Sequence, residues 1–252
     1  MPKLHYPLIT NHLIDLLPKQ QQLTLLQRCE RVELTFGNIL CEANQAYDYL
    51  YFPLSGFISL LIELPGHKPL EMGLIGNEGM LGVTLVLDID IAPTQAVVQG
   101  SGTALRISVA VLQQQLENCP QLQQIIRRYF FVLMAQLSQN AACLHFHQLE
   151  HRLARWLLMS HNRAHSDSFH LTHQFLADML GVRRSGVTVA AGHLQQKQII
   201  SYSRGIISVL NYRALQAEAC ECYQDGLNNY TRMLGQLTTD SAQRLSATQG
   251  TP

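Results

Sequence analysis

A short segment of the chain collects side chains that can recognise phosphates and base edges. Arg183, Arg184, Ser185 and Thr188 lie within six residues of one another, where a run with helical periodicity begins. Arginine is the side chain that most often forms paired hydrogen bonds with guanine, and hydroxyl groups bind phosphates or either type of base. This chemistry predicts contact with the major groove of double-stranded DNA.

The elements around that segment have the pattern of a helix-turn-helix. Such a motif needs two short helices across a tight turn, with a small residue at their approach and apolar residues at inward positions. We predict helices over 171–180 and 185–196, with Ala177 as the small residue and Gly181 where the turn requires a positive φ. The inward positions hold Leu176, Leu180, Val182, Val187 and Ala190. Two packed helices without a role in DNA binding are the alternative interpretation.

The flanks of the motif extend the predicted interface. Thr172 is suited to cap the first helix. Residues 199–209 have the pattern of strand, tight turn and strand, with the turn at Arg204 and Gly205, which predicts a wing. Arg204 at its tip would meet a backbone phosphate, unless it is simply a solvated turn residue.

The first half of the chain has a different character. Between Val32 and Ile107, short apolar or alternating runs recur between Gly, Pro, Asn and Asp residues, which is typical of strands. The clearest run is 49–62, where Pro53 and Gly56 mark a turn. Further strands are predicted at 39–41, 71–75, 95–98 and 104–107. A compact barrel or double-layered roll accommodates so many short strands.

After Pro120 the apolar residues recur at helical steps. The stripe consists of Leu122, Ile125, Ile126, Tyr129, Phe130, Leu133, Met134, Leu137, Ala141 and Leu144. A helix of roughly 25 residues is about 37 Å long, more than one small β domain covers, so we expect the stripe to pair with a second copy of the chain. A helix inside the core of one chain is the alternative. Another helix is predicted over 149–165.

Composition indicates a folded protein with an uneven distribution of charge. The 252 residues are 47% hydrophobic and 14% charged, enough for two modest domains with cores. The net charge is zero, but residues 1–147 hold 8 Lys and Arg against 11 Asp and Glu, whereas residues 148–222 hold 8 against 5. A net charge of +3 on the later part favours a polyanion partner weakly, because many domains without such a partner carry it too.

Cysteine and histidine spacing predicts no metal site, and the sequence requires no cofactor. Six cysteines occur without a Cys-x-x-Cys pair or finger-like spacing. The Cys220-Glu221-Cys222 run is expected to reflect helix packing, with a reactive thiol sensor as the alternative. His147 and His151, with His145 nearby, could bind haem or a metal from one helical face, but solvated or capping histidines are the preferred interpretation.

Targeting and catalytic motifs are missing from the sequence. It has no pattern of a signal peptide and no apolar stretch of about 20 residues, so we expect a cytoplasmic protein without a membrane partner. It also has no fingerprint of a hydrolase, a metalloprotease or a nucleotide-binding enzyme. An enzymatic function is therefore not expected.

The segments 152–158 and 171–188 resemble the cyclic-AMP receptor and fumarate-nitrate regulator (Crp/Fnr) superfamily, and the resemblance covers nearly the whole chain. It implies an α+β fold with an N-terminal β-roll of the cyclic-nucleotide-binding type (1–118), a long dimerisation helix (119–147), a winged helix-turn-helix (148–222) and a C-terminal tail (223–252), which we expect to be frayed. It also implies a homodimer on a two-fold symmetric operator, and contact with RNA polymerase if the protein is an activator.

The same resemblance assigns roles to single residues. Arg184 falls on the main base-reading arginine of the family, and Thr172 and Gln174 fall on phosphate-contacting positions. Ser185 and Val189 occupy places where well-known members have Glu and Arg, so we expect a different preferred DNA sequence.

The resemblance also places a pocket for an effector. The residues that it assigns there are Gly76, Asn77, Glu78, Gly79, Thr94, Leu137 and Ser138. Members that bind cyclic nucleotides hold the phosphate with an arginine, but no Lys or Arg lies between Lys68 and Arg106 here. We therefore expect an effector other than cyclic AMP. Cys29 and Cys41 are too few for an iron–sulfur cluster. A haem or ligand sensor that acts through protein contacts, with weak or no DNA binding, is the alternative function.

Overall fold

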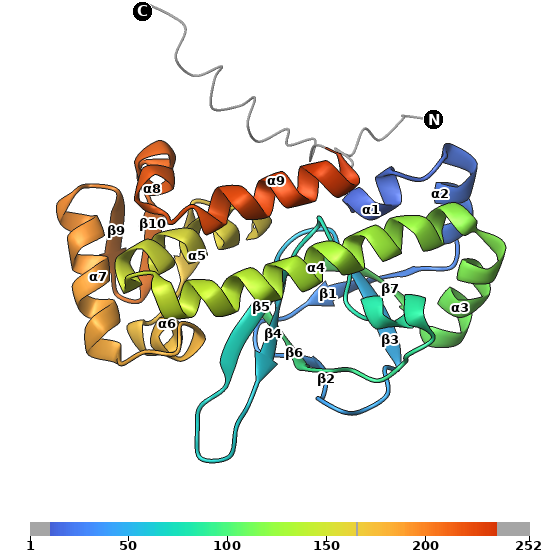
Figure 1. The fold of residues 1–252 in the computed structure, drawn as a ribbon, viewed down its shortest axis with the longest axis horizontal. Coiled ribbons are helices and arrows are strands. Elements are labelled where there is room, and N and C mark those ends of the chain that lie inside the picture. Colours follow the sequence, from blue (N-terminus) through green and yellow to red (C-terminus); the bar gives the residue numbers. More distant parts are fainter. Residues whose placement is uncertain (1–10, 165, 236–252) are drawn as a thin grey trace, which may run out of the picture.

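The computed structural model describes residues 11–164 and 166–235. Its buried apolar side chains form two main cores, one in the N-terminal half and one in the C-terminal half. Figure 1 shows the long helix α4 (Pro120–Phe146) extending from the first half to the second. The fold class expected from the sequence, a β-rich N-terminal part, a long helix and a C-terminal helix-turn-helix, is confirmed.

The N-terminal core lies within a β-roll of two antiparallel sheets. One sheet has the strand order β1-β7-β3 and the other β2-β6-β4-β5. The strands are β1 (Glu30–Leu34), β2 (Ile39–Cys41), β3 (Tyr49–Pro53), β4 (Phe57–Ile62), β5 (Leu70–Ile75), β6 (Gln95–Gly100) and β7 (Gly102–Ser108). Helices α1 (His12–Asp15) and α2 (Lys19–Leu26) precede the roll, the 3₁₀ helix η1 (Val83–Leu87) lies within it, and α3 (Val109–Asn118) follows it.

The predicted strands of this half are confirmed, and the turn in the clearest run is where the sequence placed it. Pro53 ends β3 and Gly56 has a φ of 73°. A Cβ on Gly56 would lie 2.3 Å from the carbonyl oxygen of Gly100, so the close approach to β6 requires glycine. Strand β1 was not singled out, because its charged residues hide the alternation that marks a strand.

Helix α4 has 27 residues, which makes it about 40 Å long. The expectation that its apolar stripe pairs with a second copy is wrong for the first part of the stripe, which belongs to the core of the same chain. Buried there are Leu122, Ile125, Ile126, Tyr129 and Leu133. The β-roll covers one flank of α4, and the C-terminal helix α9 (Cys222–Leu234) runs along another (Figure 1). Phe131 and Met134 remain 47% and 49% exposed.

Helix α9 corrects the expectation of a frayed tail from residue 223. Its polar composition conceals four buried positions, Cys222, Tyr223, Tyr230 and Leu234, and the last two join the N-terminal core. The Tyr230 hydroxyl donates a hydrogen bond to the Glu78 carbonyl oxygen at 2.7 Å. These long-range contacts hold a helix that composition alone does not predict. The remainder of the predicted tail, 236–252, lies outside the described residues.

The C-terminal core holds the predicted helix-turn-helix and wing. Its elements are α5 (Leu149–Ala164), β8 (Ser168–His170), α6 (His173–Met179), α7 (Arg184–Gln196), β9 (Ile200–Ser203), β10 (Ile206–Val209) and α8 (Tyr212–Glu218). The three strands form a small sheet in the order β8-β10-β9. Strand β8 was not anticipated, because three residues are too few for a periodic signal. Among the described residues, no helix is long and apolar enough to cross a membrane.

Candidate nucleic-acid interface

Helices α6 and α7 meet across the turn that the sequence predicted. The Thr172 hydroxyl accepts a hydrogen bond from the Phe175 backbone N–H at 3.1 Å and so caps α6, as expected. Gly181 has a φ of 64°, the left-handed conformation that the turn requires. The inward positions are buried or, for Val182, partly buried in the C-terminal core, and Ala177 is 1% exposed. The two helices of the motif are therefore held together by apolar side chains of the C-terminal core.

The wing follows as strands β9 and β10 joined by a two-residue turn. Arg204 and Gly205 have φ values of 50° and 80°, so both central residues of the turn are left-handed, as in a tight hairpin whose twist matches its strands. The backbone N–H of Tyr202 donates to the Gln195 side chain at 2.8 Å, which fastens the wing to α7. The wing therefore has a defined position beside the second helix.

A hollow of about 430 Å³ lies between the first helix, the second helix and the wing. Four of the seven predicted DNA-binding side chains line it. The lining residues are His170, Thr172, His173, Gln174, Arg184, Tyr202, Arg204 and Gly205. Two arginines, a hydroxyl and an amide thus converge on one concave surface, which has the chemistry to hold a phosphate backbone.

The other three predicted residues lie at the beginning of α7. Arg183, Ser185 and Thr188 are exposed, and so are the four predicted residues in the hollow. In the part of the chain that the structure describes, Arg183, Arg184 and Arg204 form no ion pair with a carboxylate. Three guanidinium groups are therefore free to meet anionic oxygens or base edges.

His173 organises the floor of this surface, and the sequence analysis did not single it out. The Thr188 hydroxyl donates to the Arg184 carbonyl oxygen at 3.1 Å, so it accepts the 2.9 Å hydrogen bond from Nδ1 of His173. The imidazole also stacks on the Tyr202 ring, with centroids 4.1 Å apart. Burial and then the nearby Arg184 lower the pKa of His173. A neutral imidazole therefore joins α6, α7 and the wing.

Helix α6 also contacts the β-roll. Asp178 pairs with Lys68 at 2.8 Å and accepts a hydrogen bond from the Gln174 amide at 2.8 Å. Phe175 packs against a small cluster of Leu61, Val97 and Met179. The predicted phosphate-contacting Gln174 is therefore part of a chain of contacts that reaches the loop between β4 and β5.

The predicted effector residues are only partly brought together. Gly76, Asn77, Glu78 and Gly79 follow β5 in one turn, whereas Ser138 is exposed on α4, and Thr94 is buried immediately before β6. Leu137 contacts β5, with its Cδ2 3.2 Å from the position that a Cβ on Gly73 would take.

Side chains of the protein itself occupy the surroundings of that turn. The carboxylate of Glu78 pairs with Arg163 of α5 at 2.7 Å and accepts a hydrogen bond from the Gly76 backbone N–H at 3.2 Å. The Tyr129 ring lies so close to Gly79 that a Cβ there would be 2.0 Å from its hydroxyl. Glu78 is thus engaged by α5 rather than free for a ligand.

The histidines that could have shared a helical face take different partners. Nδ1 of His151 donates to the Glu218 carbonyl oxygen at 2.6 Å and so caps the end of α8. His145 is exposed and lies edge-on to Phe146. His147 instead faces three cysteines, Cys143, Cys220 and Cys222, a convergence that the sequence scan did not anticipate.

Comparison with known proteins agrees with this architecture. The family model described as the Crp-like helix-turn-helix domain matches residues 151–218. No curated protein sequence matches the chain.

Several solved structures share the fold at low sequence identity. FixK2 from Bradyrhizobium japonicum has a TM-score of 0.64 and 13% identity over 76% of this chain and 98% of its own. The c-di-GMP responsive regulator CLP from Xanthomonas campestris has a TM-score of 0.62 and 16% identity over 76% of this chain and 99% of its own. A transcriptional regulator of the Crp/Fnr family from Eubacterium rectale has a TM-score of 0.62 and 15% identity over 84% of this chain and 97% of its own. The chain therefore contains a Crp-like helix-turn-helix domain at residues 151–218 and shares its overall fold with these regulators.

Proposed function

We propose that the chain acts as a homodimer that reads a two-fold symmetric operator, each subunit placing α7 in the major groove of one half-site. The hollow carries the proposal, because it joins Thr172, Gln174, Arg184 and Arg204 on one exposed surface. Arg184 reads a base edge, and the other three contact phosphates. Arg183, Ser185 and Thr188 complete the base-reading face of α7.

The exposed side of α4 supports the homodimer. Phe131, Met134, Ser138 and Ala141 are exposed at steps of three and four residues, the spacing of a helix seam. Two large apolar side chains followed by two small ones allow the helices of two subunits to approach closely along this side. In this proposal residues 119–147 dimerise, residues 148–222 bind DNA, and residues 1–118 sense an effector.

The proposed effector is not cyclic AMP. Glu78 is already paired with Arg163, and no Lys or Arg between Lys68 and Arg106 is available to neutralise a cyclic phosphate. A buried phosphate without a cation is costly, so a ligand of other chemistry fits this roll better. As a regulator of transcription the protein would act in the bacterial cytoplasm, and it would contact RNA polymerase if it activates.

Fluorescence anisotropy with genomic and random duplexes at several salt concentrations tests the proposal. We expect steep salt dependence, because each neutralised phosphate releases counterions. Arg184→Ala should cost about 1 to 3 kcal/mol on the best operator and relax discrimination at one base pair per half-site. Arg204→Ala should weaken binding to all sequences alike and lower the salt slope by about 1.

Arg213→Ala is the matched control, because Arg213 is an exposed arginine on α8 outside the hollow. It should leave both affinity and salt slope unchanged. Equal losses for Arg184→Ala on every sequence would contradict its base-reading role. If the protein bound neither kind of duplex, with or without a cell extract that supplies small effectors, the alternative of a sensor acting through protein contacts would hold instead.

A further inference from the structure

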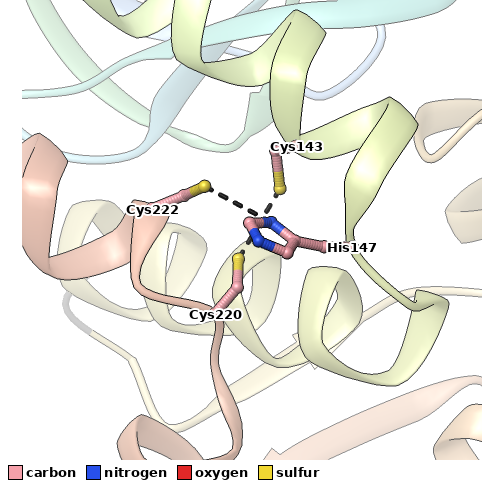
Figure 2. Close-up of side chains that lie close together, drawn as sticks. All are labelled: Cys143, His147, Cys220 and Cys222. Atoms are coloured by element: carbon pink, nitrogen blue, oxygen red, sulfur yellow. Dashed lines mark hydrogen bonds between the residues drawn. The ribbon is translucent and has the colours of Figure 1, made fainter.

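Three cysteines and one histidine converge at the junction between the long helix and the C-terminal half. Cys143 lies in the last turn of α4, and His147 is the residue with extended backbone that ends this helix. Cys220 lies in the link between α8 and α9, and Cys222 is the first residue of α9. The four ligand atoms all lie within 4.8 Å of one another. Figure 2 shows the side chains of the three cysteines pointing toward the His147 ring.

Two distances within this cluster are close to those of a tetrahedral metal site. Sγ of Cys143 is 3.6 Å from Sγ of Cys220, and Sγ of Cys222 is 3.4 Å from Nδ1 of His147. With zinc bonds of about 2.3 Å to sulfur and about 2.0 Å to nitrogen, tetrahedral angles separate two sulfurs by about 3.8 Å and a sulfur from a nitrogen by about 3.5 Å. Two edges of the tetrahedron thus have nearly the required lengths.

The surroundings orient the histidine for ligation. Nε2 of His147 lies 3.0 Å from the Glu221 carboxylate, and as a donor in that hydrogen bond it carries the proton. Nδ1 then presents its lone pair to the sulfurs. A carboxylate behind a ligating histidine is a recurring feature of zinc sites, because it fixes the tautomer and raises the basicity of the ring.

Neighbouring side chains also stabilise the negative charge of three thiolates. The cysteines are 1%, 7% and 2% exposed, so solvent stabilises their charge little. The buried Arg155 lines the same small cavity as Cys143, and the Gln139 amide donates to Sγ of Cys222 at 3.0 Å. Three thiolates with one divalent ion carry a net charge of −1, which Arg155 offsets.

We propose that Cys143, His147, Cys220 and Cys222 form a closed four-coordinate site for a zinc ion. Sulfur and imidazole ligands in a tetrahedral arrangement select zinc over the hard cations, and four protein ligands leave no open position for a substrate. A four-iron cluster would lie between its thiolates and hold them farther apart. A Cys143–Cys220 disulfide would need an oxidant and would leave the approach of His147 and Cys222 unexplained.

The position of the site indicates what the metal does. Only residues 147 and 148 separate α4 from α5, and His147 is one of them. A zinc ion would tie this joint to the beginning of α9 and so fix the C-terminal half relative to the long helix. This part of the inference rests on the end of α4 and the segment 220–222, outside the proposed DNA-binding surface, and so it stands whether or not the proposed DNA recognition is correct.

Metal analysis of the full chain, purified under reducing conditions without a histidine tag, tests the site. We expect one zinc ion per chain by native mass spectrometry and a lower unfolding temperature after chelation. Cobalt added to the metal-free protein should give the visible bands of a tetrahedral ion and sulfur-to-cobalt charge transfer from three thiolates. This spectrum of the unaltered protein remains decisive if variants fail to fold.

Variants then assign the ligands. Cys222→Ser should remove one of the three thiolate contributions, whereas Cys29→Ser and Cys119→Ser, outside the cluster, should leave the spectrum unchanged. Glu221→Gln should weaken zinc binding roughly 10- to 100-fold in competition with a chelator. Asp225→Asn, an exposed acid on the same helix, is its control. The proposal fails if the reduced protein does not bind stoichiometric metal. It also fails if Cys29→Ser or Cys119→Ser abolishes metal binding while Cys222→Ser leaves it unchanged.

Discussion

The carboxylate of Glu78 and the guanidinium of Arg163 form an ion pair of 2.7 Å that joins the turn after β5 to helix α5. Both side chains are about one-tenth exposed, at 11% and 12%. The pair connects the β-roll with the helix that leads into the helix-turn-helix, and it occupies the carboxylate that the family resemblance assigns to an effector. Its strength therefore bears on the stability of the protein and on the proposed effector site.

Removing one partner of this pair should destabilise the protein strongly. We expect Arg163→Met to cost about 3 kcal/mol or more, because it leaves the Glu78 carboxylate buried without its cation. The double variant Arg163→Met with Glu78→Gln should lose less than the sum of the single changes. Urea unfolding measures these losses. Lys68→Met, which breaks the exposed pair with Asp178, should cost less than about 1 kcal/mol, and an equal loss there would refute the special position of the buried pair.

Glu71 should make stability depend on pH. Burial raises its pKa to about 7, although Ser59 and Trp156 donate hydrogen bonds of 2.6 and 2.7 Å to the carboxylate. Because the folded pKa lies above the unfolded value of 4.5, the stabilising contribution is complete below pH 4.5 and is lost as pH rises through 7. The loss amounts to at most about 3 kcal/mol.

Comparison with Glu71→Gln isolates this effect. The amide keeps an acceptor for Trp156 but does not ionise, so the variant should lose stability less steeply than the unaltered protein between pH 5 and 8. Unfolding midpoints across that range provide the measurement. Parallel curves for the two proteins would show that Glu71 does not titrate in the window.

Thr172 should separate the stability of α6 from DNA binding. Thr172→Ala should cost about 1 kcal/mol, because the Phe175 N–H loses its cap. Thr172→Asp restores the cap and should recover stability, but it places a negative charge in the hollow and should weaken DNA binding. Thr172→Ser should recover both. Thermal unfolding measures the stability of each variant, and fluorescence anisotropy measures its affinity for DNA. Tight DNA binding by the aspartate variant would exclude a phosphate near this position.

The exposed face of α4 should carry dimerisation. Phe131→Glu combined with Met134→Glu should convert the dimer into a monomer, because four charges across a two-fold seam repel one another and cannot be buried. Analytical ultracentrifugation measures the change. Leu23→Glu, at a comparably exposed apolar residue on α2, should leave the dimer intact. A monomeric unaltered protein, or dissociation by the control as well, would contradict this interface.

Much of the helix-turn-helix could be predicted from local pattern. The Thr172 cap, the left-handed Gly181 and the Arg204–Gly205 turn follow from backbone preferences within a few residues. The strands of the roll were predictable where alternation was clear, and β1 was not, because Glu30, Arg31 and Glu33 obscure its apolar positions. His173 lacked a local signal, since its role depends on Thr188 and Tyr202 together.

The sequence by itself determined most elements of the helix-turn-helix and the side chains that α7 exposes, because helical period, capping and turn conformation depend on neighbouring residues. Only the tertiary structure decided which surfaces those elements cover. It placed Tyr230 beside Glu78, 152 residues away, and so made a helix of a polar tail. It also joined a Cys-x-x-x-His pair to a Cys-x-Cys pair, although Cys143 and Cys220 are 77 positions apart in the chain. Neither half holds four ligands alone, so the site exists only where α4 meets α9.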